Sequence, residues 1–243
     1  YLGSNTVQVA DASPYNDTVI QHERGHYAVF NFSASDSPGG FHQLSNCNQD
    51  LRLAFDEGFA TYFGQSVRLH FGLSHPQLYA KMTGASGPGN LDFYFDVEDE
   101  EPFSCKGGTS EATVYATLWD LVDTASTADD SPGIEESWDV MGSSGPLVWD
   151  VMRNYLPSAA SKSVEDFWDG WFIRAAGSLG SMITMFGKHG MDFKHDLAEP
   201  NEAVEFSLFL SSNGVPFRAS YFKDQGNGPR RGTHCNRCRR SGR

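Results

Sequence analysis

NDTVIQHERGHYAVF, residues 16–30, is the segment that decides the fold. Residues four apart lie on one face of an α-helix, so His22 and His26 can bind one metal ion with Glu23 beside it. We expect a helix here, because polar residues that cap helices precede apolar residues on both sides of the motif. Gly25 would let a neighbouring helix approach closely. A helix that carries these residues by coincidence is the alternative.

A third ligand is expected from residues 51–68, LRLAFDEGFATYFGQSVR, whose apolar spacing predicts a core helix. A catalytic zinc ion has three protein ligands and one position for water. A buried carboxylate is costly without a cationic partner, and Glu57 lies in the middle of this segment. Asp56 is the alternative, but adjacent helix positions point about 100° apart, so only one of the two can face the ion. Of the two, we predict Glu57.

The two segments together resemble the gluzincin metallopeptidases. In their aminopeptidase branch, His-Glu-x-x-His is followed by a helix similar to the Asp-Glu-Gly-Phe-Ala-Thr-Tyr of residues 56–62, which supplies a zinc-binding glutamate. Residues 37–42 and 118–121 are also similar to segments of uncharacterised secreted bacterial proteins that have this motif pair.

The resemblance implies a zincin-like catalytic domain that hydrolyses peptide bonds in a peptide or protein substrate. His22, His26 and Glu57 would bind one Zn²⁺ per chain, and Glu23 would be the general base. The zinc ion would polarise the scissile carbonyl and lower the pKa of its bound water toward about 7. A zinc-binding structural or peptide-binding domain without catalysis is the alternative function, and a metal-free helical interaction domain is a third.

The chain departs from the aminopeptidase branch in three respects. The loop between the ligand helices is longer, the Gly-x-Met-x-Asn signature is absent, and residues 109–112 replace the segment with the oxyanion-stabilising tyrosine. We predict that Tyr115 is the substitute phenol. Tyr62 and Tyr94 are alternatives, and a structural role in the core is the commoner one for a tyrosine on an apolar face.

The long loop carries two further residues of interest. His42 would pass near the metal, where it would bind substrate, become an extra ligand or lie at the surface. Cys47 in the same loop and Cys105 form a disulfide if the compartment is oxidising; two buried thiols are the alternative. Cys235 and Cys238 are half of a zinc knuckle without a second pair, which favours a loose tail over a second metal site.

The rest of the chain predicts a mainly α-helical fold with a few edge strands. The predicted helices are residues 109–123, 147–155, 164–176 and 178–186, with a short helix over 76–81. The acidic run of residues 92–101 is predicted to be a solvated loop. We expect one metallopeptidase-like domain over residues 1–222 and a basic, disordered tail over 223–243.

Composition restricts the partners of this protein. The net charge is −13, and residues 1–222 contain eleven Lys and Arg against thirty Asp and Glu, which argues against nucleic acid. No apolar run reaches eighteen residues, so we expect no membrane span. The acidic body suits a secreted or extracellular protein, and the initial Tyr without a visible signal peptide suggests a processed chain or fragment. The sequence does not indicate an oligomeric state.

Overall fold

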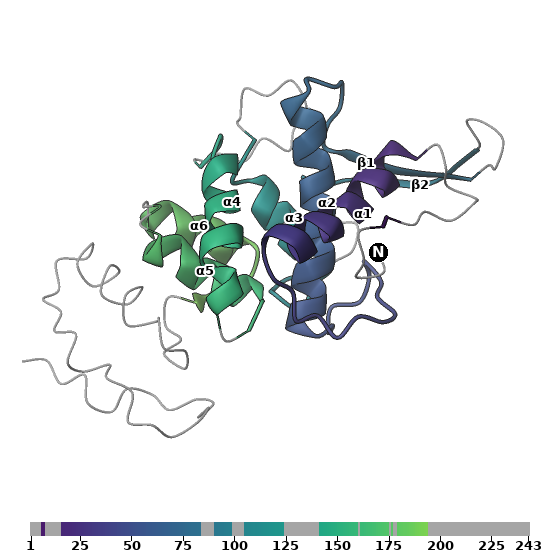
Figure 1. The fold of residues 1–243 in the computed structure, drawn as a ribbon. Coiled ribbons are helices and arrows are strands. Elements are labelled where there is room, and N and C mark those ends of the chain that lie inside the picture. The colour runs from purple at the N-terminus through teal and green to yellow at the C-terminus, as the bar shows by residue number, and fades with distance from the viewer. Residues whose placement is uncertain are drawn as a thin grey trace, which may run out of the picture.

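The computed structural model describes residues 6–7, 16–83, 90–98, 105–123, 141–159, 161–174, 176 and 179–193. These residues are mainly α-helical, as the sequence predicts, with one small antiparallel sheet of two strands (Figure 1). The helices are α1 Asp17–Phe32, α2 Leu51–His70, α3 Glu111–Trp119, α4 Gly145–Asn154, α5 Val164–Ile173 and α6 Leu179–Lys188. The strands are β1 Leu78–Thr83 and β2 Asn90–Asp96, and a 3-10 turn, Leu156–Ser158, follows α4.

Helices α1 and α2 pack closely because each contributes a glycine to their contact. A Cβ atom on Gly25 of α1 would lie 2.7 Å from the Cα atom of Ala60. A Cβ atom on Gly64 of α2 would lie 3.2 Å from the backbone nitrogen of His22. The expectation that Gly25 permits a close helix contact is therefore confirmed, and Figure 1 shows α1 beside the long α2.

Helix α3 forms the centre of the fold. The Ser110 side chain caps its start by accepting a hydrogen bond from the Thr113 backbone N–H, and every residue of the helix is buried. Gly58 of α2 leaves room for the Val114 side chain of α3, since a Cβ atom on Gly58 would lie 2.7 Å from Val114 Cβ. The predicted helix over residues 109–123 thus exists and packs on the second predicted ligand helix.

Helices α4, α5 and α6 cover the other side of this core. They match the helices predicted over residues 147–155, 164–176 and 178–186. Aromatic side chains join the two layers: the rings of Phe55 and Phe167 are 6.2 Å apart, and those of Phe59 and Trp149 are 6.4 Å apart. The ligand-bearing part of α2 is therefore held between α1 on one side and a large aromatic core on the other.

The β-hairpin shows that two predictions were wrong. Residues 76–81 were expected to be helical, and residues 92–96 were expected to belong to a solvated loop. Instead β1 pairs antiparallel with β2, with Tyr79 opposite Phe95. Phe95 and Val97 are buried, with 5% and 0% exposed, whereas Tyr94 is 66% exposed, so burial alternates along the segment as in a half-buried strand. The expected edge strands are this hairpin, and residues 99–101 lie outside the described part.

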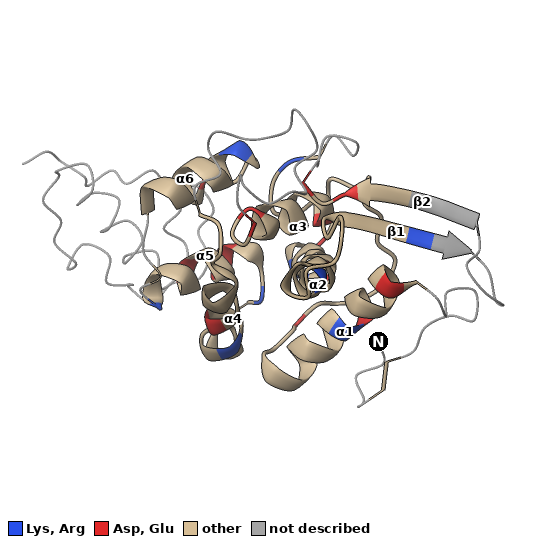
Figure 2. Ribbon diagram, turned by 90° about the horizontal axis from the view of Figure 1, so that it is seen from above, with Lys and Arg blue, Asp and Glu red and all other residues tan. Residues whose placement is uncertain are grey.

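A disulfide joins Cys47 in the α1–α2 loop to Cys105 before α3, so the alternative of two free thiols is wrong. None of the described helices combines the length and apolar character needed to cross a membrane. The described Lys and Arg residues are scattered over several elements (Figure 2). The predicted tail over 223–243, with Cys235 and Cys238, lies outside the described residues.

Candidate metal centre

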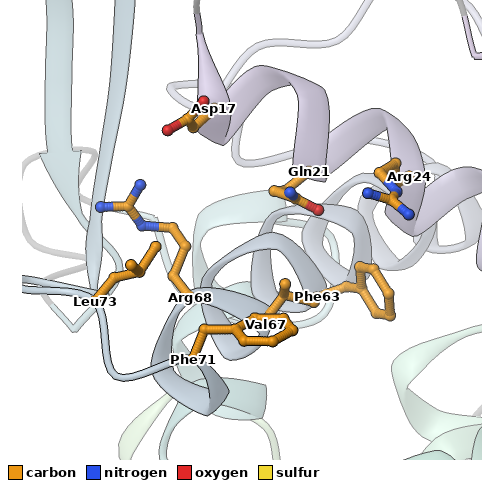
Figure 3. Close-up of a pocket in the computed structure, with 8 residues that line it drawn as sticks. All are labelled: Asp17, Gln21, Arg24, Phe63, Val67, Arg68, Phe71 and Leu73. Atoms are coloured by element: carbon orange, nitrogen blue, oxygen red, sulfur yellow. The ribbon is translucent and has the colours of Figure 1, made fainter.

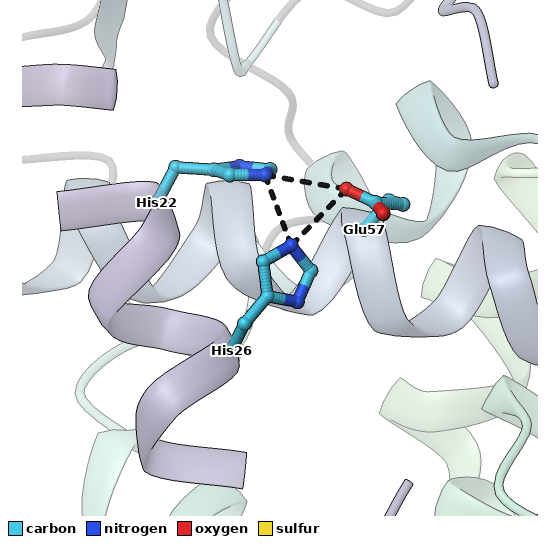
Figure 4. A group of neighbouring side chains, drawn as sticks. All are labelled: His22, His26 and Glu57. Carbon is cyan, nitrogen blue, oxygen red and sulfur yellow. Dashed lines mark hydrogen bonds and ion pairs between the residues drawn. The ribbon is translucent and has the colours of Figure 1, made fainter. Parts of the chain in front are cut away.

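Three predicted ligands converge on one point between α1 and α2 (Figure 4). The Nε2 atoms of His22 and His26 are 3.2 Å apart, and each is 3.2 Å from Oε2 of Glu57. A tetrahedral zinc ion with bonds of about 2.0–2.1 Å would separate its ligand atoms by about 3.3 Å. The three atoms therefore have the spacing that a zinc ion requires.

The packing of the two helices explains this convergence. His22 and His26 are one turn apart on the face of α1 that meets α2, and Gly25 lies between them at the closest contact. Glu57 lies in the second turn of α2, opposite this face. The side chains are largely buried, with exposed fractions of 11% for His22 and 13% for Glu57. A carboxylate in such a place needs a cationic partner.

Both imidazoles are oriented by a second contact on the side away from Glu57. His22 Nδ1 lies 3.0 Å from the Thr61 hydroxyl, and His26 Nδ1 lies 3.2 Å from a carboxylate oxygen of Asp56. If each Nδ1 donates its proton to these oxygens, each Nε2 presents a lone pair to the centre, which is the usual arrangement of metal-binding histidines. Asp56, the alternative third ligand, therefore lies behind His26, and Glu57 is the carboxylate that faces the centre.

The histidines and carboxylates of this group shift one another's pKa values. Burial alone would raise the pKa of Glu57, but hydrogen bonds with His22 and His26 outweigh it and hold the pKa of Glu57 well below its usual range. Burial alone would lower the pKa of His26, but hydrogen bonds to Asp56 and Glu57 raise the pKa of His26 to about 10. In the metal-free protein, a proton on His26 thus partly supplies the positive charge that a metal ion would bring.

Glu23, the predicted general base, is half-buried on α1 next to His22. Tyr79 of β1 lies beside His22, and the two rings meet edge-on with their centres 6.3 Å apart. Burial raises the pKa of the Tyr79 phenol, and the negative charges of Glu111, Glu23 and Glu57 raise it further. Glu23, adjacent to His22 on α1, is thus one of the acidic residues whose charge acts on Tyr79.

Tyr115 lies in the hydrophobic core and is not one of the candidate metal ligands. Its side chain is fully buried, and its ring stacks on Phe95 with ring centres 5.2 Å apart. Phe95 in turn stacks on Tyr79 at 4.8 Å, so Tyr79 is the tyrosine of this stack that reaches His22. The role of Tyr115 in oxyanion stabilisation stays a prediction that its position does not support. Of the two alternatives, Tyr62 is also buried, whereas Tyr94 is exposed on β2.

A second group of candidate ligands shares Glu57 with the first. In it the ligand atoms of His42, Glu57 and Glu111 lie within 4.8 Å of one another. His42 Nδ1 is 2.9 Å from Glu111 Oε2, and His42 Nε2 is 3.5 Å from Glu57 Oε2. Glu111 is 4% exposed in the first turn of α3. The sequence drew attention to His42, but it gave Glu111 no role at the centre; an acidic residue in an otherwise apolar helix was the available signal.

The pocket shown in Figure 3 is separate from this centre. It has a volume of about 800 Å³ between α1 and the end of α2. Its lining residues on α1 are Asp17, Gln21 and Arg24, which lie on a different side of the helix from His22 and His26. Its residues on α2 and beyond are Phe63, Val67, Arg68, Phe71 and Leu73. None of the candidate ligands lines this pocket.

Comparison with known proteins identifies one distant relative and no family. An uncharacterized protein of Archaeoglobus fulgidus is 31% identical over 143 residues, which cover 58% of this chain and 36% of that protein. The chain thus spans about a third of the length of this relative. No protein-family model matches the chain, and no solved structure matches it.

Proposed function

We propose that this protein is a zinc-dependent peptidase in which His22, His26 and Glu57 bind one Zn²⁺ and Glu23 is the general base. The observation that carries the proposal is the triangle of ligand atoms with sides of 3.2 Å. Two imidazole nitrogens and a carboxylate oxygen directed at one point need a positive charge between them, either a shared proton or a metal ion. A mixed set of nitrogen and oxygen ligands at this spacing suits zinc.

The proposed reaction divides the chemistry between the ion and the protein. When bound, zinc would supply a Lewis acid that polarises the scissile carbonyl and activates water. Glu23 would accept a proton from the attacking water and deliver it to the nitrogen of the leaving amine. The remaining residues hold these groups in place: Thr61 and Asp56 orient the imidazoles, and α2 fixes Glu57.

Substrate and location are proposed from charge and the disulfide. The net charge of −13 would favour neutral or basic peptides over acidic ones. The Cys47–Cys105 disulfide is typical of proteins in oxidising compartments, which supports a secreted or extracellular location.

Elemental analysis and a peptidase assay on three proteins test this function. We expect about one zinc per chain in the wild type, and a sharp loss of zinc in Glu57→Ala. Glu23→Gln should keep its zinc but lose about 10²- to 10⁴-fold in hydrolysis rate, the usual contribution of a general base. A wild-type protein that binds no zinc, even after zinc is added back, would refute the metal site and leave a metal-free helical domain.

A zinc-binding structural or peptide-binding domain is the second candidate function. It is favoured by His42 and Glu111, which lie next to the triad and offer a fourth ligand, because structural zinc sites are usually closed by four protein ligands. Wild-type protein that holds zinc tightly, hydrolyses no peptide from a diverse mixture and behaves like Glu23→Gln would support this function over catalysis.

A further inference from the structure

His42 repeats the arrangement of the two predicted histidine ligands. In all three histidines, Nδ1 contacts an oxygen atom outside the centre and Nε2 is directed toward Glu57 Oε2. The Nδ1 distances are 3.0 Å for His22 to Thr61, 3.2 Å for His26 to Asp56 and 2.9 Å for His42 to Glu111. The Nε2 distances to Glu57 Oε2 are 3.2 Å for His22, 3.2 Å for His26 and 3.5 Å for His42.

This repetition suggests a shared purpose. A metal-binding histidine almost always donates its other ring N–H to a carboxylate, a backbone carbonyl or water, which fixes the ring and makes Nε2 a better ligand. Glu111 is well suited to that task because its carboxylate is buried and comes from the rigid helix α3. We propose that His42 is a reversible fourth protein ligand of the metal centre and that Glu111 orients it. This inference rests on the proposed metal site and goes beyond its three ligands.

His42 lies beside the group of His22, His26 and Glu57, not in the fourth position that a tetrahedral metal ion bound by these three residues would offer. The candidate ligands divide into two groups that share Glu57, so His42 does not join His22 and His26 in one cluster within 4.8 Å. A fourth ligand of a tetrahedral ion would lie about 3.3 Å from each of the other three. Binding therefore requires His42 to move toward the two other histidines.

The loop that carries His42 is anchored near both ends and has open space next to His42. It is fixed at one end by a hydrogen bond of 3.1 Å from the Lys162 backbone N–H to the Asp36 carboxylate, and at the other end by the Cys47–Cys105 disulfide. Between these anchors, a Cβ atom on Gly39 or Gly40 would meet nothing within 4 Å. Leu44 in this segment packs against the core, whereas Gly39, Gly40 and Phe41 are exposed next to His42, whose side chain is 35% exposed.

Two states of the centre follow from this geometry. With His42 bound, four protein ligands would fill a tetrahedral site and exclude water, as in structural zinc sites. With His42 in its present position beside the three ligands, the fourth position would be open to water and substrate. One loop residue would thus decide whether the centre is closed or open.

Metal binding by the full chain tests the proposal without an activity assay. Zinc affinity is measured by competition with a chromophoric chelator for the wild type, His42→Ala, Glu111→Gln and the control His70→Ala, which removes an exposed histidine at the end of α2. We expect His42→Ala to weaken zinc binding by about 10- to 100-fold and Glu111→Gln by about tenfold, the usual range for such contacts. His70→Ala should bind zinc like the wild type.

Cobalt provides a second measurement, because the visible absorption of bound Co²⁺ depends on its ligands. We expect His42→Ala to change the spectrum of the cobalt protein and His70→Ala to leave it unchanged. If wild type and His42→Ala share one affinity and one spectrum, His42 is no ligand and the inference is wrong, while the three-ligand site stands. If the wild type binds neither zinc nor cobalt, the proposed function fails first. If His42→Ala does not fold, Glu111→Gln is the deciding variant: weaker zinc binding than in the wild type supports the inference, and equal zinc binding contradicts it.

Discussion

Replacement of Gly25 by alanine tests whether the contact between α1 and α2 sets the geometry of the candidate metal centre. The added Cβ atom would lie 2.7 Å from Ala60 Cα and 3.0 Å from Ala60 O. Carbon atoms in comfortable contact are about 3.5–4.0 Å apart, so the helices must separate by roughly 0.8 Å or more. Because the obstacle is backbone, no side-chain rotation can relieve it.

The expected magnitude follows from this displacement. His22 and His26 are on α1 and Glu57 is on α2, so separation of the helices stretches the 3.2 Å distances between them. If fully transmitted, a shift of roughly 0.8 Å takes these distances to about 4.0 Å, beyond the roughly 3.3 Å of a tetrahedral zinc site. Overpacking costs about 1–3 kcal/mol, whereas alanine improves helix propensity by about 1 kcal/mol. We expect a net loss of about 1 kcal/mol in unfolding free energy and at least about tenfold weaker zinc binding.

Denaturant unfolding of the metal-free protein and chelator competition for zinc measure the two effects. Gly187→Ala in α6 is the matched control, since its new Cβ atom would meet nothing within 4 Å. That variant should gain up to about 1 kcal/mol in unfolding free energy and keep its zinc affinity. If Gly25→Ala were as stable as the wild type and bound zinc equally well, the helix contact would not control the centre.

Two further predictions concern pH and the disulfide. Burial alone would lower the pKa of His26, but hydrogen bonds to Asp56 and Glu57 outweigh it and raise this pKa to about 10. In the unfolded chain the pKa of a histidine is about 6.5. The protonated ring therefore stabilises the metal-free fold fully below about pH 6.5, and this stabilisation is lost as the pH rises to about 10. Unfolding free energy of chelator-treated protein should therefore fall as pH rises toward about 10, while zinc affinity rises as the proton leaves; stability that does not change over this range contradicts the assignment. The Cys47–Cys105 disulfide links residues 58 positions apart, so Cys47→Ser with Cys105→Ser should lose about 2–4 kcal/mol and melt at lower temperature. Reductant should destabilise the wild type and leave this double variant unchanged, and a wild type that is insensitive to reductant argues against a stabilising role.

The elements that carry the predicted ligands were readable from the sequence because local patterns specify them. The four-residue spacing of His22 and His26 places both imidazoles on one face of a helix, and Gly25 between them allows a second helix to approach that face closely. The roughly 100° between adjacent helix positions allowed only one of Asp56 and Glu57 to face the centre, and the resemblance favoured Glu57. The structure places Asp56 behind His26.

The remaining features depend on contacts between distant segments, which local patterns do not contain. The hairpin was missed because Pro76 was taken as a helix start and the acidic residues of 92–96 as signs of a solvated loop. Phe93, Phe95 and Val97 nevertheless recur at every second position, which is the period of a strand. The pairing of His42 with Glu111 joins residues 69 positions apart, and that of His22 with Thr61 joins residues 39 apart. Such pairings appear only when the helices are packed.

The stack of Tyr79, Phe95 and Tyr115 has a consequence for how mutants of this protein are interpreted. The three rings form a continuous column from the middle of α3, through the hairpin, to the His22 imidazole. Removal of the Tyr115 ring would leave space under Phe95. Phe95 and Tyr79 would shift into that space, and the ring that contacts His22 would move. Loss of hydrolysis in Tyr115→Ala would therefore not identify Tyr115 as a group that touches substrate. Only Tyr115→Phe, which keeps the column and removes one hydroxyl, separates a chemical role from a mechanical one.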